Sequence, residues 1–331
     1  MDGLLTKILA NYELDYKNIK KTKGYYIVNT ADKTYALRKT GDSADHIEFR
    51  CAVQKKLLNN GFFNLEKIYP AREGSLFVLH EEQKYILTDY ISGEGAGFED
   101  REELSEILRC LADFHHKSKG AGRVAERFYA AHMGERLKRM AKELSIFRKK
   151  INFSKTLSDF DLIFLKNYEY YERNINTAIE ILAKTDYNEK LKEALLQNAV
   201  CHNLLKKETI VIKESAVFLT SLSDCIRDHF TSDIAMIIAR YLKYDIKGSI
   251  AAMEIINMYS DFGHTRLDRN DYRIILARLL MPSGFLSVLE QYYKKKRTWA
   301  PSALTGDLEY EIKSQKDFWG YIEPLFSICC S

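Results

Sequence analysis

Gly93, Gly95 and Gly97 are the first residues whose type and spacing suggest chemistry, because glycine-rich loops often bind phosphate groups. Such loops place their glycines between a strand and a helix, or in the hairpin of the first two strands. The only glycine near the first expected hairpin is Gly24, and its turn, residues 29–33, contains none. A backbone that approaches phosphates closely normally needs glycine there. We therefore interpret the three glycines as a hinge between two lobes, and the glycine-poor hairpin argues against tight nucleotide binding.

The six cysteines are the second candidate for chemistry. They lack the paired C-x-x-C spacing of zinc and redox motifs, so neither kind of site is predicted. Four of them lie among apolar residues and are expected in the core. Cys329 and Cys330 are adjacent at the end of the sequence. An exposed pair of this kind can cross-link to a partner, and a frayed tail with free thiols is the simpler interpretation.

Composition sets the class of protein that must position any site. The chain has 331 residues, 46% apolar and 29% charged, which is typical of a globular protein with two lobes or domains. The net charge of +4 is spread along the chain and gives no reason to expect a nucleic-acid partner. We expect no signal peptide, and no run of about 18 apolar residues that would span a membrane. The chain is therefore expected to be intracellular where it is made.

The first part of the chain is predicted to be a β-rich lobe, residues 1–91. After a short opening helix, aromatic and β-branched runs at 25–28 and 34–38 predict a hairpin. Residues 44–59 carry apolar side chains at helical spacing. Three further short strands are expected within the ranges 65–69, 76–79 and 85–90.

Residues 92–331 are predicted to form a mostly helical lobe. Apolar side chains recur at helical spacing from about residue 103 to a glycine at 120 that suits a helix end. Further helices are expected at 125–150, 158–184, 188–200, 231–243, 246–259, 268–279, 283–297 and 308–326.

Two motifs make a family resemblance specific: Tyr-Ile-Leu-Thr-Asp-Tyr-Ile-Ser-Gly at 85–93 and Leu-Ala-Asp-Phe-His-His-Lys-Ser-Lys-Gly at 111–120. This pair resembles the CotS-type spore coat protein family, a bacterial branch of the aminoglycoside-phosphotransferase-like kinases. Further matches follow in order at 158–161, 200–203, 228, 232–235, 282–285 and 292–296. The resemblance covers nearly the whole chain. It implies an α+β, bilobal protein-kinase-like fold, with a small antiparallel β N-terminal lobe and a large helical C-terminal lobe.

The resemblance also implies where catalytic residues belong, and these positions hold other residues. Active relatives follow Cys-His-x with an aspartate that positions or deprotonates the acceptor hydroxyl, and five residues later with an asparagine that holds the metal. Here the two positions are Leu204 and Thr209. Leucine neither accepts a proton nor binds a cation, and a threonine hydroxyl is a poor replacement for an amide oxygen. Phosphoryl transfer depends on such groups because it consists mostly of positioning and charge neutralisation.

The expected metal ligands further along the chain are missing in the same way. The family has Asp-x-Asp two residues before a cysteine, and here Ser221 and Ser223 precede Cys225. Magnesium bound to phosphates is usually held through one or two carboxylates, so no metal site is predicted. Asp224 is adjacent, but as the next residue of a strand it is expected to face away.

A vestigial nucleotide cleft is expected in the first lobe. The resemblance places Arg38 where a lysine would contact phosphates, and arginine is not an equivalent substitute for that point charge. Glu48, on the predicted helix at 44–59, is the candidate carboxylate that would orient Arg38. Thr88 and Tyr90 complete this candidate nucleotide site.

Four polar residues of the family pattern remain: His202, Asn203, Asp228 and Asp233. In this fold the histidine usually bonds to backbone and braces the catalytic loop, so a structural role is expected for it. Asp228 and Asp233 are expected to tie loops and to cap the helix that starts near residue 232.

These observations predict a pseudokinase, a structural or interaction protein of the spore coat, assembled from the mother-cell cytoplasm with other spore coat proteins as partners. No cofactor is expected. One alternative is a divergent small-molecule phosphotransferase that uses ATP and magnesium on a sugar, aminoglycoside or choline-type hydroxyl. Another keeps nucleotide binding without catalysis, as a switch. The sequence does not identify the binding partner, the oligomeric state or any ligand of the cleft.

Overall fold

The computed structural model describes residues 2–22, 24–121, 132–152, 156–244, 251–262, 266–294 and 301–330. The chain divides into two compact units, one formed by residues 1–129 and 193–230, the other by residues 130–192 and 231–331. The predicted boundary at residues 91 and 92 lies inside the first of these units and stays a prediction.

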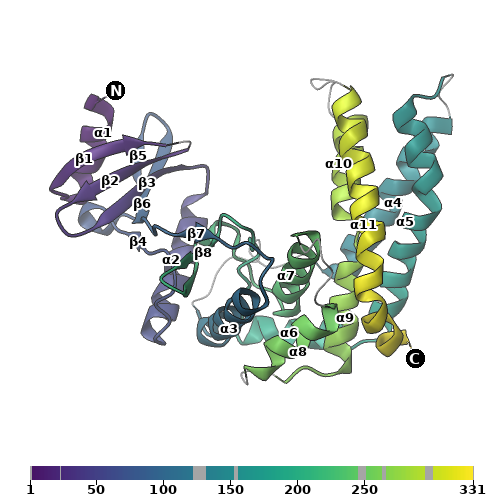
Figure 1. Ribbon diagram of the computed structural model, residues 1–331. Helices are drawn as coiled ribbons and strands as arrows, with labels where there is room; N and C mark the ends of the chain where they lie inside the picture. The colour runs from purple at the N-terminus through teal and green to yellow at the C-terminus, as the bar shows by residue number, and fades with distance from the viewer. Residues whose placement is uncertain are drawn as a thin grey trace. The chain divides into compact units, whose positions relative to one another are not determined.

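An antiparallel sheet dominates the beginning of the first unit (Figure 1). Its strands are β1 (Tyr16–Lys21), β2 (Tyr25–Thr30), β3 (Thr34–Thr40), β4 (Ile68–Tyr69), β5 (Val78–His80) and β6 (Gln83–Asp89). They are ordered β1-β2-β3-β6-β4, with β5 also paired to β6. In this register Ala36 pairs with both Ile27 and Thr88. Because side chains alternate along a strand, these three share one face of the sheet with Arg38.

Helix α1 (Asp2–Leu9) covers the opposite face of the sheet (Figure 1). Its Leu5, Ile8 and Leu9 form one buried cluster with sheet residues that include Val28 and Leu87. Helix α2 (Ala44–Asn59) follows β3 and begins at Ser43, whose hydroxyl accepts a hydrogen bond from the His46 amide at 3.3 Å.

The predicted strands and the α2 helix are present, with one omission. Strand β1 was not predicted because most of its side chains are lysine or polar, as is common for a strand at the edge of a sheet. The strands expected at 65–69 and 76–79 are shorter in the structure, as β4 and β5. The expected hairpin at 25–38 is confirmed by the pairing of β2 with β3.

A second, three-stranded sheet lies in the same unit. It contains β7 (Glu94–Gly95), β8 (Ile210–Lys213) and β9 (Ala216–Leu219), and helix α3 (Arg101–Ser118) packs against β9. A β-carbon on Gly93 would lie 2.4 Å from the Ile212 carbonyl oxygen, and one on Gly95 would lie 2.4 Å from the Lys207 carbonyl oxygen. These two glycines are therefore required by close backbone approach, a reason that the hinge interpretation did not include.

The second unit is helical. Its helices are α4 (Met133–Asn152), α5 (Asp159–Ala183), α7 (Thr231–Tyr244), α8 (Ala252–Asp261), α9 (Arg269–Leu279), α10 (Ser283–Lys294) and α11 (Pro301–Cys330); the unit boundary falls within α6 (Tyr187–Leu196). Helices α5 and α9 both begin with a capping box, Ser158 with Asp161 and Asp268 with Asp271. Aromatic rings fill this core: Tyr171 stacks on Phe285 with ring centroids 3.6 Å apart.

The predicted helices are present, with shifted ends. Helix α6 ends four residues earlier than expected, and α11 is longer at both ends and includes Pro324. The expected starts near 125 and 246 and the expected end at 297 lie outside the described residues. Cys329 is not part of a frayed tail: it is buried in α11, and its carbonyl accepts a hydrogen bond from the Arg273 side chain at 3.1 Å. The side chain of Cys330 lies outside the described part of the chain.

One stretch, Arg269–Lys294, is long and apolar enough to cross a membrane by length and composition alone. The expectation that no such run exists was therefore wrong. The stretch contains α9 and α10, which meet at Met281 and Pro282, and 61% of its most apolar window is buried within the fold. That degree of burial is typical of a core helix.

Candidate functional site

The loop at residues 201–209 and the turn after β9 lie together in the first unit. Cys201 and Ile226 form a two-way backbone bridge, with N···O distances of 2.9 and 3.1 Å. The fully buried His202 donates through Nε2 to the Thr220 carbonyl oxygen at 2.9 Å. His202 thus joins the loop to the end of β9, which is the backbone contact that a bracing role predicts.

Thr209 occupies the position where a metal-binding amide was expected, and its hydroxyl is turned into the loop. Its side chain is buried. The hydroxyl donates to the Leu204 carbonyl oxygen and accepts from the Lys206 amide at 3.1 Å. Thr209 therefore closes the loop on itself, and its oxygen is occupied by backbone partners.

The two serines at the expected aspartate positions contact each other. The Ser221 and Ser223 hydroxyl oxygens are 3.0 Å apart. Ser221 has a left-handed backbone, with φ of 57° and ψ of 72°. This conformation is several-fold more common for asparagine and aspartate than for other residues with side chains. The backbone at position 221 is thus one that suits aspartate better than serine.

The expectation for Asp224 rested on the wrong local structure. Strand β9 ends at Leu219, and Leu222–Asp224 is a 3-10 helix, so strand alternation does not set the direction of Asp224. The carboxylate of Asp224 accepts a hydrogen bond from the Ser223 hydroxyl at 3.0 Å, and its main-chain carbonyl accepts one from Asn203 Nδ2 at 3.1 Å. Asp224 is therefore next to the serine pair, and it is exposed.

Arg38 pairs with Glu66, a residue that sequence reasoning missed. Both Arg38 Nε and one terminal nitrogen lie 3.0 Å from Glu66 Oε1. The guanidinium also lies over the Tyr25 ring, 4.5 Å from its centroid. Glu48, the predicted partner, is exposed on α2. The carboxylate that orients Arg38 comes instead from the segment between α2 and β4.

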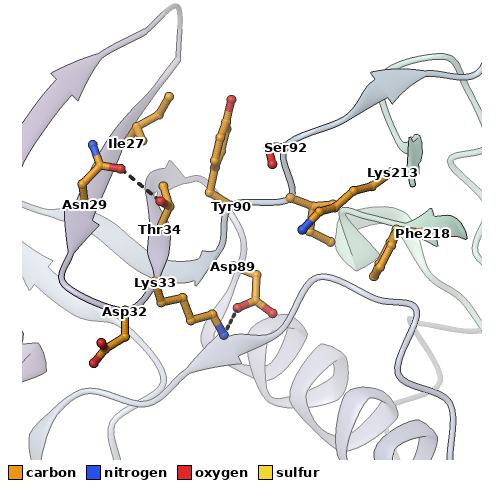
Figure 2. A pocket seen from close by; sticks show the side chains of 11 residues that line it. Ile27, Asn29, Asp32, Lys33, Thr34, Asp89, Tyr90, Ser92, Lys213 and Phe218 are labelled. Atoms are coloured by element: carbon orange, nitrogen blue, oxygen red, sulfur yellow. Dashed lines mark hydrogen bonds and ion pairs between the residues drawn. The ribbon is translucent and has the colours of Figure 1, made fainter. Parts of the chain in front are cut away.

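Thr88 and Tyr90, the other predicted cleft residues, lie in different surroundings. Thr88 is buried, and its hydroxyl donates to Glu66 Oε1 at 2.6 Å. Tyr90 lines a pocket of about 420 Å³ that is formed by residues from β2, β3, the segment after β6, and the β8–β9 hairpin. Figure 2 shows Lys213 and Phe218 on one side of this pocket and Asn29 and Thr34 on the other.

The charges of the pocket are partly neutralised within it. Lys33 Nζ and Asp89 Oδ1 form an ion pair at 2.5 Å, drawn dashed in Figure 2. Burial opposes the charge of Lys33, but its contacts with Asp89 and Tyr69 outweigh burial and raise the Lys33 pKa. Lys33 therefore stays protonated and committed to Asp89.

The remaining predicted residues lie on either side of the division between the units. Asp228, in the first unit, is buried and accepts a hydrogen bond from the His229 amide at 2.7 Å. Asp233, in the second unit, is buried in the first turn of α7, where a negative charge suits the helix dipole. Asp233 is the third residue of α7, the position that Asp161 and Asp271 hold in their capping boxes, and its expected capping role stays a prediction.

Comparison with known proteins now identifies the family. A family model described as spore coat putative kinase YutH matches residues 6–323. The chain belongs to this family. Spore coat protein S of Bacillus subtilis (strain 168) is 19% identical over 333 residues, which cover 98% of this chain and 94% of that protein. The endospore coat-associated protein YutH of the same organism is 23% identical over 224 residues, covering 67% and 62% of the two chains.

Solved structures confirm the predicted kinase-like fold. An aminoglycoside phosphotransferase from Alicyclobacillus acidocaldarius matches with a TM-score of 0.84 at 13% identity, covering 98% of this chain and 96% of that one. Spectinomycin phosphotransferase, solved with ADP and spectinomycin, matches with a TM-score of 0.61 at 14% identity, covering 100% and 97%. At such identities the likeness shows the fold alone.

Proposed function

We propose that this member of the YutH family is a catalytically inactive kinase-like protein that serves as a structural or interaction component of the bacterial spore coat. The names of its family and relatives support the coat assignment. The side chains at the former catalytic positions support the loss of activity.

The state of Thr209 is the observation that carries the proposal. Phosphoryl transfer needs cations that neutralise the phosphate oxygens, and magnesium demands oxygen ligands that point at it. Thr209 directs its hydroxyl to the Leu204 carbonyl oxygen instead. The Ser221 and Ser223 hydroxyls bond to each other, and Leu204 has no ionisable group. This set of donors does not fit a magnesium ion.

Calorimetric titration with ATP, with and without magnesium, tests the proposal directly. We expect no micromolar binding that depends on the metal, and no phosphate transfer to sugar, aminoglycoside or choline acceptors. Metal-dependent micromolar binding combined with transfer would overturn the proposal.

The position of Asp224 favours a second candidate, a divergent small-molecule phosphotransferase. Its exposed carboxylate adjoins Ser223, so it is the carboxylate best placed to replace the missing metal ligands. If this candidate is correct, Asp224→Asn abolishes phosphate transfer. Glu208 is an exposed carboxylate of the neighbouring loop, and the control variant Glu208→Gln leaves transfer intact. Under the pseudokinase proposal neither variant changes anything, since there is no activity to lose.

The proposed location is the spore coat, reached from the mother-cell cytoplasm, with other coat proteins as partners. A fluorescent fusion in a sporulating bacterium should form a shell around the forespore, and the protein should be extracted with the coat fraction of purified spores. A fusion that stays diffuse in the mother cell, and is missing from the coat fraction, would contradict the location.

A further inference from the structure

Hydrogen-bond donors from three distant parts of the first unit converge on the carboxylate of Glu66. Arg38 on β3 and Thr88 on β6 both donate to Oε1, at 3.0 and 2.6 Å. The backbone amide of Ser221, in the turn after β9, donates to Oε2 at 2.8 Å. A guanidinium, a hydroxyl and a backbone N–H are the groups that proteins use to bind carboxylate and phosphate anions. Glu66, whose side chain is 5% exposed, fills this anion site from within.

The carboxylate also connects two sheets, because its oxygens are divided between them. Oε1 faces the strands of the large sheet, and Oε2 faces the turn that follows the small one. Two neighbouring contacts also join this segment to β9. The Leu219 amide donates to the Asn64 carbonyl oxygen at 3.0 Å, and Asn64 Nδ2 donates to the Val217 carbonyl oxygen at 2.8 Å. Segment 64–66 is thus attached to β9 and its turn at three successive points.

We propose that Glu66 is a built-in anion that holds Ser221 in its left-handed conformation and closes the large sheet onto the β9 turn without any bound nucleotide or metal. The left-handed backbone of Ser221 is unfavourable for serine and persists only when its surroundings fix it. The bond from its amide to Glu66 Oε2 provides that fixation. The site that remains when the Glu66 carboxylate is removed should accept a small carboxylate or phosphate anion.

An isosteric substitution tests whether one Glu66 oxygen holds the large sheet and the other holds the turn after β9. In Glu66→Gln one side-chain atom becomes an NH₂ donor, which faces either the donors on the sheet or the Ser221 amide. One of the two connections must therefore break. We expect hydrogen exchange to accelerate by about tenfold to a hundredfold on the side that loses its connection, since a hydrogen bond to a charged group contributes about 1.5–3 kcal/mol. The affected peptides cover residues 217–225 if the NH₂ faces the Ser221 amide, and β3 and β6 if it faces Arg38 and Thr88. Glu48→Gln, an exposed carboxylate on α2, is the matched control and should leave exchange unchanged.

Chemical rescue tests the anion site itself. Glu66→Ala should unfold at a lower temperature, and formate or acetate should restore more of its melting temperature than chloride at equal ionic strength. Formate should do little for the unmodified chain or for Glu66→Gln, in which the site remains filled. Inorganic phosphate is the second probe, and a selective effect of phosphate would assign the site to phosphate rather than carboxylate.

Two results would overturn the proposal: in Glu66→Gln, exchange that is unchanged both at 217–225 and in the peptides covering β3 and β6, or a Glu66→Ala variant that responds to formate no more than the unmodified chain does. If Glu66→Ala does not fold, the exchange measurement on Glu66→Gln still decides. Both tests are made without ATP, so their outcome is independent of the outcome of the calorimetric titration. Binding of ATP and magnesium together with phosphate transfer would contradict the proposed function and leave the role of Glu66 intact.

Discussion

Substitution of Gly95 by alanine is the sharpest test of how the glycine cluster positions the site. A β-carbon at this position would lie 2.4 Å from the Lys207 carbonyl oxygen, whereas real β-carbons essentially never approach closer than 3.0 Å. The two backbones must therefore separate by at least 0.6 Å, the difference between those distances. The nearby bond from the Ala96 amide to the Ile210 carbonyl oxygen, now 2.9 Å, would lengthen with them.

The magnitude follows from these two effects. Overpacking typically destabilises by about 1–3 kcal/mol, and a weakened backbone hydrogen bond adds about 1 kcal/mol. Gly95→Ala should therefore lower the free energy of unfolding by roughly 2–4 kcal/mol. A unit of this size loses about 2–4 °C of melting temperature per kcal/mol, so a decrease of about 5–15 °C is expected. Thermal and urea unfolding, followed by circular dichroism and fluorescence, measure both quantities.

Gly97→Ala is the matched control. A β-carbon there would lie 3.7 and 3.8 Å from the Glu103 carboxylate oxygens, which is ordinary van der Waals contact. Its stability should change by less than about 1 kcal/mol, and a small gain is expected because alanine restricts the unfolded chain. If the glycines acted mainly as a hinge, the two substitutions would behave alike. Equal effects of Gly95→Ala and Gly97→Ala would refute the close-approach explanation.

Three further predictions concern chemistry and pH. Leu204→Asp, Ser221→Asp and the combination of both should give no measurable phosphate transfer in a coupled assay, because base and metal ligands act as a unit and Thr209 remains committed to the loop. Burial raises the pKa of Asp161, but hydrogen bonds from Tyr293 and Ser158 outweigh it and hold the pKa below its ordinary value. The Asp161 carboxylate should thus stabilise the fold above about pH 4, and this contribution should be lost as pH falls through the folded pKa of Asp161. Urea titrations at several pH values measure the free energy of unfolding, and its dependence on pH should be weaker in Tyr293→Phe. Burial raises the pKa of the Cys225 thiol to about 12, so Cys225 should react with a thiol reagent at pH 8 only after unfolding.

Most of the fold was accessible from the sequence because the apolar spacing and the family motifs are local signals. The hairpin at 25–38, helix α2 and the long helices follow from such patterns. Strand β1 was not predicted because its exposed lysines leave no regular alternation of apolar and polar residues. The turn after β9 was treated as a continuing strand, and this placed Asp224 on the wrong side.

For the candidate site, the sequence predicts which positions belong to it but not which residues they contact. The motifs give the place of Leu204, Thr209, Ser221 and Ser223, since these are counted from Cys201 and Cys225. Their partners are not encoded at fixed spacing: Glu66 meets Arg38, Thr88 and Ser221 across 28, 22 and 155 residues of sequence. The one available signal was an acidic residue in the mostly apolar stretch at 62–69, which is a weak sign of a buried carboxylate that needs a partner.

The backbone of Ser221 bears on both the proposed loss of catalysis and the proposed role of Glu66. A left-handed conformation is tolerated by aspartate, whose short side chain can bond locally, and is less favourable for serine. Serine, where the resemblance implies aspartate, therefore offers no carboxylate to a metal and makes the left-handed turn less favourable. The turn nevertheless keeps φ at 57°, and its amide is held by the Glu66 carboxylate. If the chain is catalytically inactive, as we propose, metal binding does not account for the shape of this turn. The hydrogen bond from the Ser221 amide to the Glu66 carboxylate then becomes the contact that we propose to hold it.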